Sequence, residues 1–545
     1  MSGRRASRLS RVVSWACPAL AASVLACVAA SAQEAPPADV EERFRRLERI
    51  VAEQAEQIRR LSEQNRALAD QARAGAADVP PPAAPFAISD EDEEVDSSPS
   101  SVEPDSPSVL APFSNSAGRT EREAFSALWD AGDESIPEED LAGKARSFLI
   151  GAYDKGFALV APSDRQRTPF SLKLNVTTQV RYTGFARSVD SWTNSAGMVL
   201  PTRDRSYFSL NRNWFSFSGF AFSPRLRFNA TVFSTSATNQ TIALGFLSYE
   251  FSKALIVNSG YFKVPGTREW IESARYPLGV DRTLANTFFR PGISPGVWVQ
   301  GEPIRDVYYV AGIFNDLSSV TNVTNRANTN MTYVGNFWWE PLGSFGPGFA
   351  DEEFHETPVV RLGASVVYDR SVREPNLEQG LTNPENTILR LSDGTPLYLP
   401  NALAPGATVE RAHVLLASYD LAVKYRGLSL SSEIYTRWMT SLRADVPTPA
   451  GTLRDIDDVG GFAQGSFALV PRRFELFART SGVFGRFGDG GAYGGGFNWY
   501  VLASRNIRAT FEAKRVNHSP ADNVLYGYFV GQSGTLFQLQ VLTDF

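Results

Sequence analysis

The 545-residue sequence has little cysteine and no long apolar run beyond its N-terminus. Its two cysteines, Cys17 and Cys27, lie in a segment that we expect to be removed, so the mature chain needs no disulfide in an oxidising compartment. Beyond residue 30, no run approaches the roughly 20 apolar residues that a membrane helix requires. This absence argues against membrane-spanning helices. It leaves open a membrane β-barrel, whose alternating strands average to mild hydropathy.

A strong charge of one sign is also lacking. The net charge of −6 gives no case for wholesale binding of nucleic acid. Histidine is scarce, and His355, His413 and His518 stand far apart without the spacing of metal ligands. The sequence therefore predicts no metal site, no cofactor and no nucleic-acid partner.

Signals for catalysis are poor. Residues 292–296 read GISPG and match the G-x-S-x-G pattern formally. A nucleophile elbow needs a strand before the serine and a helix after it, whereas this stretch ends a loop and enters a strand. We assign no catalytic residue, and the chain is not expected to be an enzyme. A soluble, secreted β-rich glycosidase with paired carboxylates is the enzymatic alternative, and the apolar strand faces argue against it.

Aromatic residues are plentiful, at 12%, and apolar and polar side chains alternate in many segments from about residue 168 onward. A period of two indicates a β-strand with one apolar and one polar face. One such face, between residues 536 and 545, carries Phe537, Leu539, Val541 and Phe545. Lipid outside, water inside and no open edge are the properties of a transmembrane β-barrel.

The connections between these segments alternate between short and long, as in outer-membrane barrels. We predict an all-β fold, an antiparallel barrel of about 16 strands over residues 147–545. Residues 341–357 are an exception, because they are long on the side where turns should be short. Residues 524–531 could form a separate strand or the outer end of the last one. The glycines at 488–496 adjoin Asp489-Gly490, which is a turn signal.

Three further segments precede the barrel. Residues 1–32 have the charged region, apolar stretch and A-x-A site of a signal peptide, with a lipoprotein signal at Cys27 as the alternative. Residues 33–74 contain heptads from 38 to 74 and predict a coiled coil, with a lone amphipathic helix as the alternative. Residues 75–146 are rich in acids and proline and predict a disordered linker, with a short helix expected between 119 and 146.

This organisation predicts a location in the outer membrane of a Gram-negative-type bacterium, with the N-terminus in the periplasm and lipid around the barrel. The coiled coil implies a homo-oligomer, although Asn65 at a core position would by itself favour two strands. Residues 38–74 could instead bind peptidoglycan or another periplasmic partner. The alternative function is therefore an outer-membrane anchor that tethers the envelope through its coiled coil.

Several stretches together resemble the phosphate-selective porin O/P family, over about residues 147–545. They are residues 153–157 (YDKGF), 208–212 (FSLNR) and 260–265 (GYFKVP), the last followed by Glu269, Ser273, Asp281, Arg282, Arg290 and Gly292. The resemblance implies trimeric sixteen-stranded barrels that pass anions through a basic channel. This chain departs from the pattern at 266–268 and has Asn211 and Asn213 where arginines are frequent. The resemblance therefore implies a basic channel more firmly than phosphate selectivity.

The longest loop after the fifth strand of a barrel can fold inward and narrow the pore, and residues 264–296 occupy that place. Guanidinium groups in a confined lumen favour anions over cations. We therefore predict passive diffusion of small anions, with phosphate or polyphosphate as candidates. The alternative is that these charges pair with nearby acids and only stiffen the loop. The predicted pathway residues are Lys263, Arg268, Arg275, Arg282 and Arg290 around the loop, and Lys173, Arg181, Arg225 and Arg227 on the wall.

Overall fold

The computed structural model describes residues 152–153, 156–160, 170–315, 317, 330–373, 383–449 and 451–545. The chain separates into two compact units, Met1–Phe113 and Ser114–Phe545, and the described residues belong to the second. The predicted signal peptide, coiled coil and linker lie outside the described residues. Among the described residues, no helix has the length and apolar character to cross a membrane.

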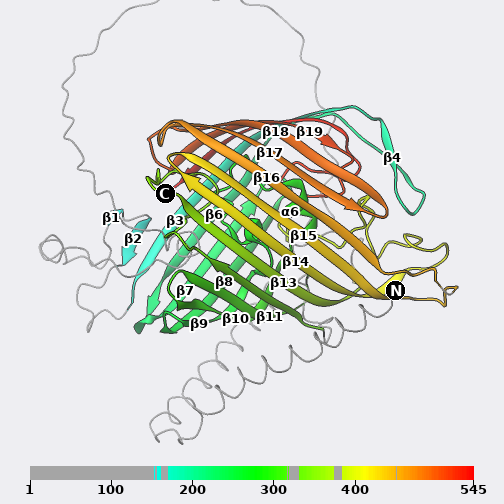
Figure 1. The fold of residues 1–545 in the computed structure, drawn as a ribbon, viewed down its shortest axis with the longest axis horizontal. Coiled ribbons are helices and arrows are strands. Elements are labelled where there is room, and N and C mark those ends of the chain that lie inside the picture. Colours follow the sequence, from blue (N-terminus) through cyan, green and yellow to red (C-terminus); the bar gives the residue numbers. More distant parts are fainter. Residues whose placement is uncertain are drawn as a thin grey trace, which may run out of the picture. The chain divides into compact units, whose positions relative to one another are not determined.

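Sixteen long strands of the described residues pair antiparallel with their neighbours and close into a barrel (Figure 1). The barrel closes where β20 pairs with β3, with Leu539 opposite Tyr182. The fold class and the strand number predicted from the sequence are therefore confirmed. The barrel strands are β3 (Leu172–Arg187), β6 (Arg205–Ala221), β7 (Ser223–Thr235), β8 (Gln240–Ser252), β9 (Leu255–Lys263), β10 (Ile293–Ile304), β11 (Val307–Phe314), β12 (Thr332–Trp339), β13 (Val359–Val372), β14 (Val409–Tyr425), β15 (Leu428–Ala444), β16 (Ile456–Val470), β17 (Phe474–Gly485), β18 (Gly488–Tyr500), β19 (Ile507–Asn517) and β20 (Gly534–Asp544).

The remaining elements are short. β1 (Ala152–Tyr153) pairs with β2 (Phe157–Val160), and β2 pairs with the first residues of β3. β4 (Ser191–Thr193) and β5 (Val199–Pro201) form a separate hairpin between β3 and β6. The helices α5 (Arg268–Ile271) and α6 (Leu284–Phe289) both lie in the connection between β9 and β10. Figure 1 shows α6 inside the barrel.

The two faces of the wall follow the period of two in the sequence. On β20, Phe537, Leu539 and Val541 point outward and are 41–47% exposed, whereas Gln538 and Gln540 point inward and are buried. An outward apolar band suits a lipid environment, in which the closed sheet satisfies every backbone hydrogen bond internally. The same division recurs on β15, where Leu430 points outward and is exposed, whereas the alternate side chains of the strand are buried in the barrel interior.

A β-bulge on β6 changes which side chains face the lumen. Gln179 of β3 lies opposite Arg212, but the next residue, Val180, lies opposite Leu210, so Asn211 is the extra residue. Because a bulge redirects the side chains that follow it, Arg212 points into the barrel.

The strand connections define two ends of the barrel. At the turn end, β14 and β15 are joined by Arg426 and Gly427, both with positive φ, and β3 begins and β20 ends there. Most long connections lie at the other end, the loop end. Residues 340–358 between β12 and β13 are the predicted long exception at the turn end.

Two local predictions were wrong. Asp489 and Gly490 lie inside β18, and the preceding turn falls at residues 486–487. Residues 524–531 form neither a separate strand nor the end of β20, because they lie in the loop between β19 and β20, where an isolated bridge joins Asn523 to Tyr528.

Candidate functional site

The loop after the fifth barrel strand, residues 264–292 between β9 and β10 and hereafter L3, lies inside the barrel. Side chains of distant strands bind its backbone: Gln179 of β3 donates to the carbonyl of Ala274 at 2.9 Å, and Asn498 of β18 donates to that of Leu278 at 2.8 Å. The inward fold predicted from the position of the loop is therefore present. Residues 293–296, included in the predicted loop, belong to β10.

Local contacts explain the compact shape of L3. Thr283 precedes α6, and its hydroxyl accepts a hydrogen bond from the backbone N–H of Asn286. The same hydroxyl donates to the Glu269 carboxylate at 2.6 Å, which ties the start of α6 to α5. The apolar side of α6 packs on the wall, where the ring of Phe289 lies 5.3 Å from that of Tyr435. L3 is thus held by a cap and by apolar packing.

Asp281 of L3 is bound by two arginines of the wall. Its carboxylate lies 2.7 Å from the guanidinium of Arg181 on β3 and 2.6 Å from that of Arg212 on β6, and all three side chains are buried. Burial alone would raise the pKa of Asp281, but the two guanidinium groups hold it well below its usual range. Asp281 therefore anchors L3 to the wall as a carboxylate.

A second buried carboxylate joins three loops. Glu385, in the connection between β13 and β14, accepts a hydrogen bond from Arg212 at 2.6 Å and another from the hydroxyl of Tyr526 at 2.6 Å. Arg282 of L3 lies 3.7 Å from the same carboxylate. Although burial opposes ionisation, these cations lower the pKa of Glu385 to about 2. Burial also raises the pKa of Tyr526 to about 12, so this phenol stays protonated and donates.

Several predicted pathway cations are buried or half-buried and make contacts that hold L3. Lys263 donates to the carbonyls of Trp270 and Glu272, each at 2.9 Å. Arg282 donates to Tyr526 at 2.9 Å and to backbone carbonyls of L3. Together with Arg181, which contacts Asp281, they hold the loop in place.

Arg268 and Arg290 are buried against aromatic rings. The guanidinium of Arg268 lies 5.0 Å from the ring of Phe345 and 4.8 Å from that of Phe349, and it is 3.5 Å from Asp420. The guanidinium of Arg290 lies 4.0 Å from the ring of Trp270. Burial lowers the pKa of both arginines from their ordinary value.

The other predicted cations retain contact with water. Arg275, in L3, is 16% exposed and lies 3.4 Å from Asp544, near the turn end of β20. Arg225 is exposed, Arg227 is 21% exposed and pairs with Glu250 at 3.1 Å, and Lys173 is half-buried. Lys173, Arg225 and Arg227 lie near the turn end of their strands, and Arg275 of L3 reaches the same end. We call Lys173, Arg225, Arg227 and Arg275 the turn-end cations.

Residues 340–358 also enter the lumen, from the turn end, and they meet L3 there. The backbone N–H of Gly348 donates to Glu272 at 3.3 Å, and Lys424 of β14 donates to the carbonyl of Pro347 at 3.1 Å. The sequence showed only that this connection is unusually long. Two segments from opposite ends of the barrel therefore occupy its interior together.

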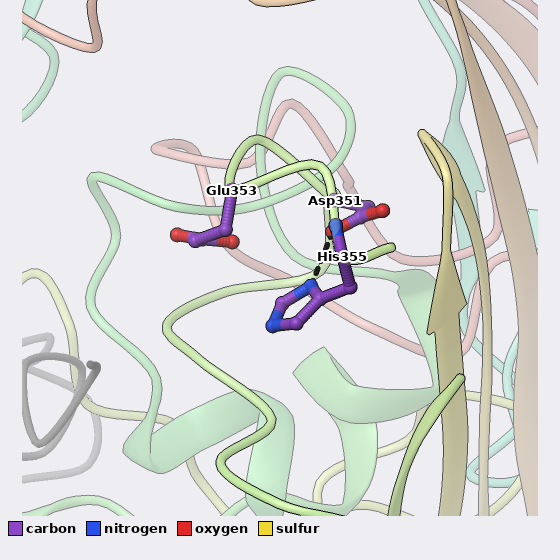
Figure 2. A group of neighbouring side chains, drawn as sticks. All are labelled: Asp351, Glu353 and His355. Carbon is purple, nitrogen blue, oxygen red and sulfur yellow. Dashed lines mark hydrogen bonds and ion pairs between the residues drawn. The ribbon is translucent and has the colours of Figure 1, made fainter. Parts of the chain in front are cut away.

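This inserted segment brings together three groups of the kind that bind metal ions, which the sequence did not predict. Asp351, Glu353 and His355 offer ligand atoms within 4.8 Å of one another (Figure 2). The Asp351 carboxylate, however, already lies 2.6 Å from Nδ1 of His355, and Glu353 lies 2.7 Å from Arg505. These contacts tie the side chains to neighbouring protein groups, and we assign no metal here. In the sequence, the sign of this group is that its three residues stand at alternate positions, 351, 353 and 355.

The G-x-S-x-G match does not form a nucleophile elbow. Ser294 lies at the start of β10 and is buried, and the strand continues to Ile304 without a helix after the serine. Ser294 therefore does not lie in the strand–turn–helix geometry that exposes such a nucleophile.

Comparison with known proteins finds no protein-family model and no curated protein that matches the chain. Among solved structures, it is similar to outer-membrane OmpT of Vibrio cholerae at 10% identity, with a TM-score of 0.42 and coverage of 69% of this chain and 98% of that one. An anion-selective porin from Comamonas acidovorans matches at 10% identity, with a TM-score of 0.42 and coverage of 69% and 100%. OprB of Pseudomonas putida matches at 9% identity, with a TM-score of 0.41 and coverage of 69% and 94%. Values this low carry no functional argument, and they leave membership of the phosphate-selective porin O/P family unestablished.

Proposed function

We propose that the protein is an outer-membrane porin through which small solutes diffuse passively, with a preference for anions. The observation that carries the proposal is a closed sixteen-stranded barrel whose fifth connection, L3, crosses the lumen and reaches Asp544 near the turn end. A strongly apolar outer face and a charged interior are what a water-filled membrane pore requires. Phosphate or polyphosphate as the solute remains a narrower form of this proposal.

The anion preference rests on the charge of L3 and on the cations that water can reach. L3 carries four arginines against Glu269, Glu272 and Asp281, and Lys263 adds one more cation. Such a small excess is screened within about 8 Å at physiological salt, so it acts only where the path is narrow. Because Arg268, Arg282 and Arg290 are buried, the turn-end cations are the groups that would meet a passing ion.

A planar bilayer experiment tests both parts of the proposal. Purified protein should produce stepwise conductance, and under a potassium chloride gradient the reversal potential should lie toward the chloride equilibrium potential. Absence of steps from correctly folded protein would remove the porin function. Steps with a cation-sided reversal potential would retain the porin and remove the anion preference.

The tether function concerns residues 38–74, which lie outside the described residues, and it stays a prediction. Deletion of residues 38–118 separates the two functions: a porin should still conduct, whereas a tether should lose envelope attachment.

A further inference from the structure

Arg290, at the end of α6, is a buried cation whose hydrogen-bonding capacity is not met by the described residues. Its side chain is 1% exposed, and Nε, Nη1 and Nη2 all lack a hydrogen-bond partner there. The face of Trp270 lies 4.0 Å from the guanidinium and stabilises its charge, but a ring face cannot accept the five N–H groups of an arginine. Something further is needed at this position.

The neighbouring carboxylates are already engaged by other cations. Glu385 binds Arg212 and Tyr526 at 2.6 Å each, and Arg282 lies 3.7 Å from it. Asp281 in turn is shared between Arg212 and Arg181. The charge of Arg290 is therefore left in excess in a dehydrated environment, where an unpaired ion is strongly unfavourable.

A small cavity adjoins Arg290, between α6 and the wall strands β14 and β15. It has room for about one water-sized particle. Arg290 and Arg437 line it together with apolar side chains such as Phe288 and Leu416, and Thr387 supplies a neutral hydroxyl. No carboxylate is among the described residues that line it. Arg437 is already neutralised by Asp458 at 2.6 Å, so the uncompensated charge at the cavity is that of Arg290.

We propose that this cavity binds a single halide ion, chloride under physiological conditions, which accepts hydrogen bonds from Arg290. A chloride ion is only slightly larger than a water molecule and so comes closest to the available room, whereas phosphate with its four oxygens is far too large. A water molecule would accept a hydrogen bond but would leave the charge uncompensated. The bound halide would hold the end of α6, and with it L3, against β14 and β15.

This inference concerns a buried structural ion and does not depend on the porin function. It is tested by thermal unfolding of the full-length protein in detergent, in sodium chloride, sodium bromide or sodium gluconate at equal ionic strength. The halides should raise the Tm over gluconate by about 2 °C or more. The difference should vanish in Arg290→Gln and persist in Arg305→Gln, whose side chain is 91% exposed.

Crystals of the wild-type protein grown with bromide give a second measurement that needs no variant. An anomalous peak in the cavity beside Arg290 is expected. Equal Tm values for the wild type in all three salts, or a cavity without bromide density, would overturn the proposal and assign the space to water. If Arg290→Gln does not fold, the wild-type salt comparison and the bromide peak still decide the matter.

Discussion

The substitution Asp281→Asn should weaken the attachment of L3 more than any comparable change at the barrel ends. Asp281 neutralises Arg181 and Arg212 at 2.7 and 2.6 Å, and the three side chains are at most 1% exposed. Asparagine keeps the size and can accept hydrogen bonds, but it removes the negative charge. Two buried guanidinium groups would then share fewer anionic partners.

The magnitude follows from burial. Removing one partner of a buried ion pair costs about 3–5 kcal/mol, because the remaining charge stays uncompensated. The matched control is Glu250→Gln, which breaks the pair with Arg227 at 3.1 Å, where the side chains are 21% and 29% exposed. Partly exposed pairs contribute about 0.2–1 kcal/mol. The two substitutions remove the same charge but should differ several-fold in effect.

The assay is the free energy of unfolding from denaturant titration of the barrel in detergent, followed by single-channel conductance. Asp281→Asn should be less stable and should show larger or noisier conductance, because L3 is released. Equal free energies for the two variants, with unchanged conductance, would refute the anchoring role of Asp281.

Three further predictions follow from other parts of the site. Glu385 has a folded pKa of about 2 against an ordinary 4.5, so its ionised form contributes about 3 kcal/mol to the free energy of unfolding above pH 5. This contribution is lost as the pH falls toward 2. Glu385→Gln should therefore flatten the pH dependence of unfolding between pH 5 and 2, and an unchanged slope would contradict this. Deleting residues 344–350 should raise single-channel conductance, because this segment meets L3 inside the barrel; unaltered steps would show that it does not narrow the path. Native mass measurement of the full-length protein in mild detergent should give three chains, and monomers alone would remove the trimer.

The wall could be predicted from the sequence because its signal is local. Alternation such as Phe537, Leu539 and Val541 depends only on neighbours along one strand, and the place of L3 follows from counting strands. The bulge at Asn211 was harder, since the run from 206 to 220 is aromatic and polar on both faces. Its exact position decides that Arg212 faces inward.

The interior could not be predicted, because its contacts join residues far apart in the chain. Asp281 meets Arg181 across 100 positions, and Glu385 meets Tyr526 across 141. No periodicity encodes these pairings, so the sequence could not separate buried arginines from water-accessible ones. The glycines of β18 led to a wrong turn prediction for a related reason, because they serve contacts with a neighbouring strand. A Cβ at Gly496 would lie 1.8 Å from the carbonyl oxygen of Phe511, so this glycine permits the two strands to approach closely.

The reversal potential of Arg275→Gln tests most directly whether L3 sets the preference for anions. This substitution removes a cation of L3 that water reaches and leaves Asp544 without that partner, so the local charge falls by one where the path is expected to narrow. Under a potassium chloride gradient, the reversal potential should move toward the potassium equilibrium potential. Arg305→Gln, at an exposed turn, should leave it unchanged. Identical reversal potentials for Arg275→Gln and the wild type would contradict the proposal that L3 sets the preference for anions.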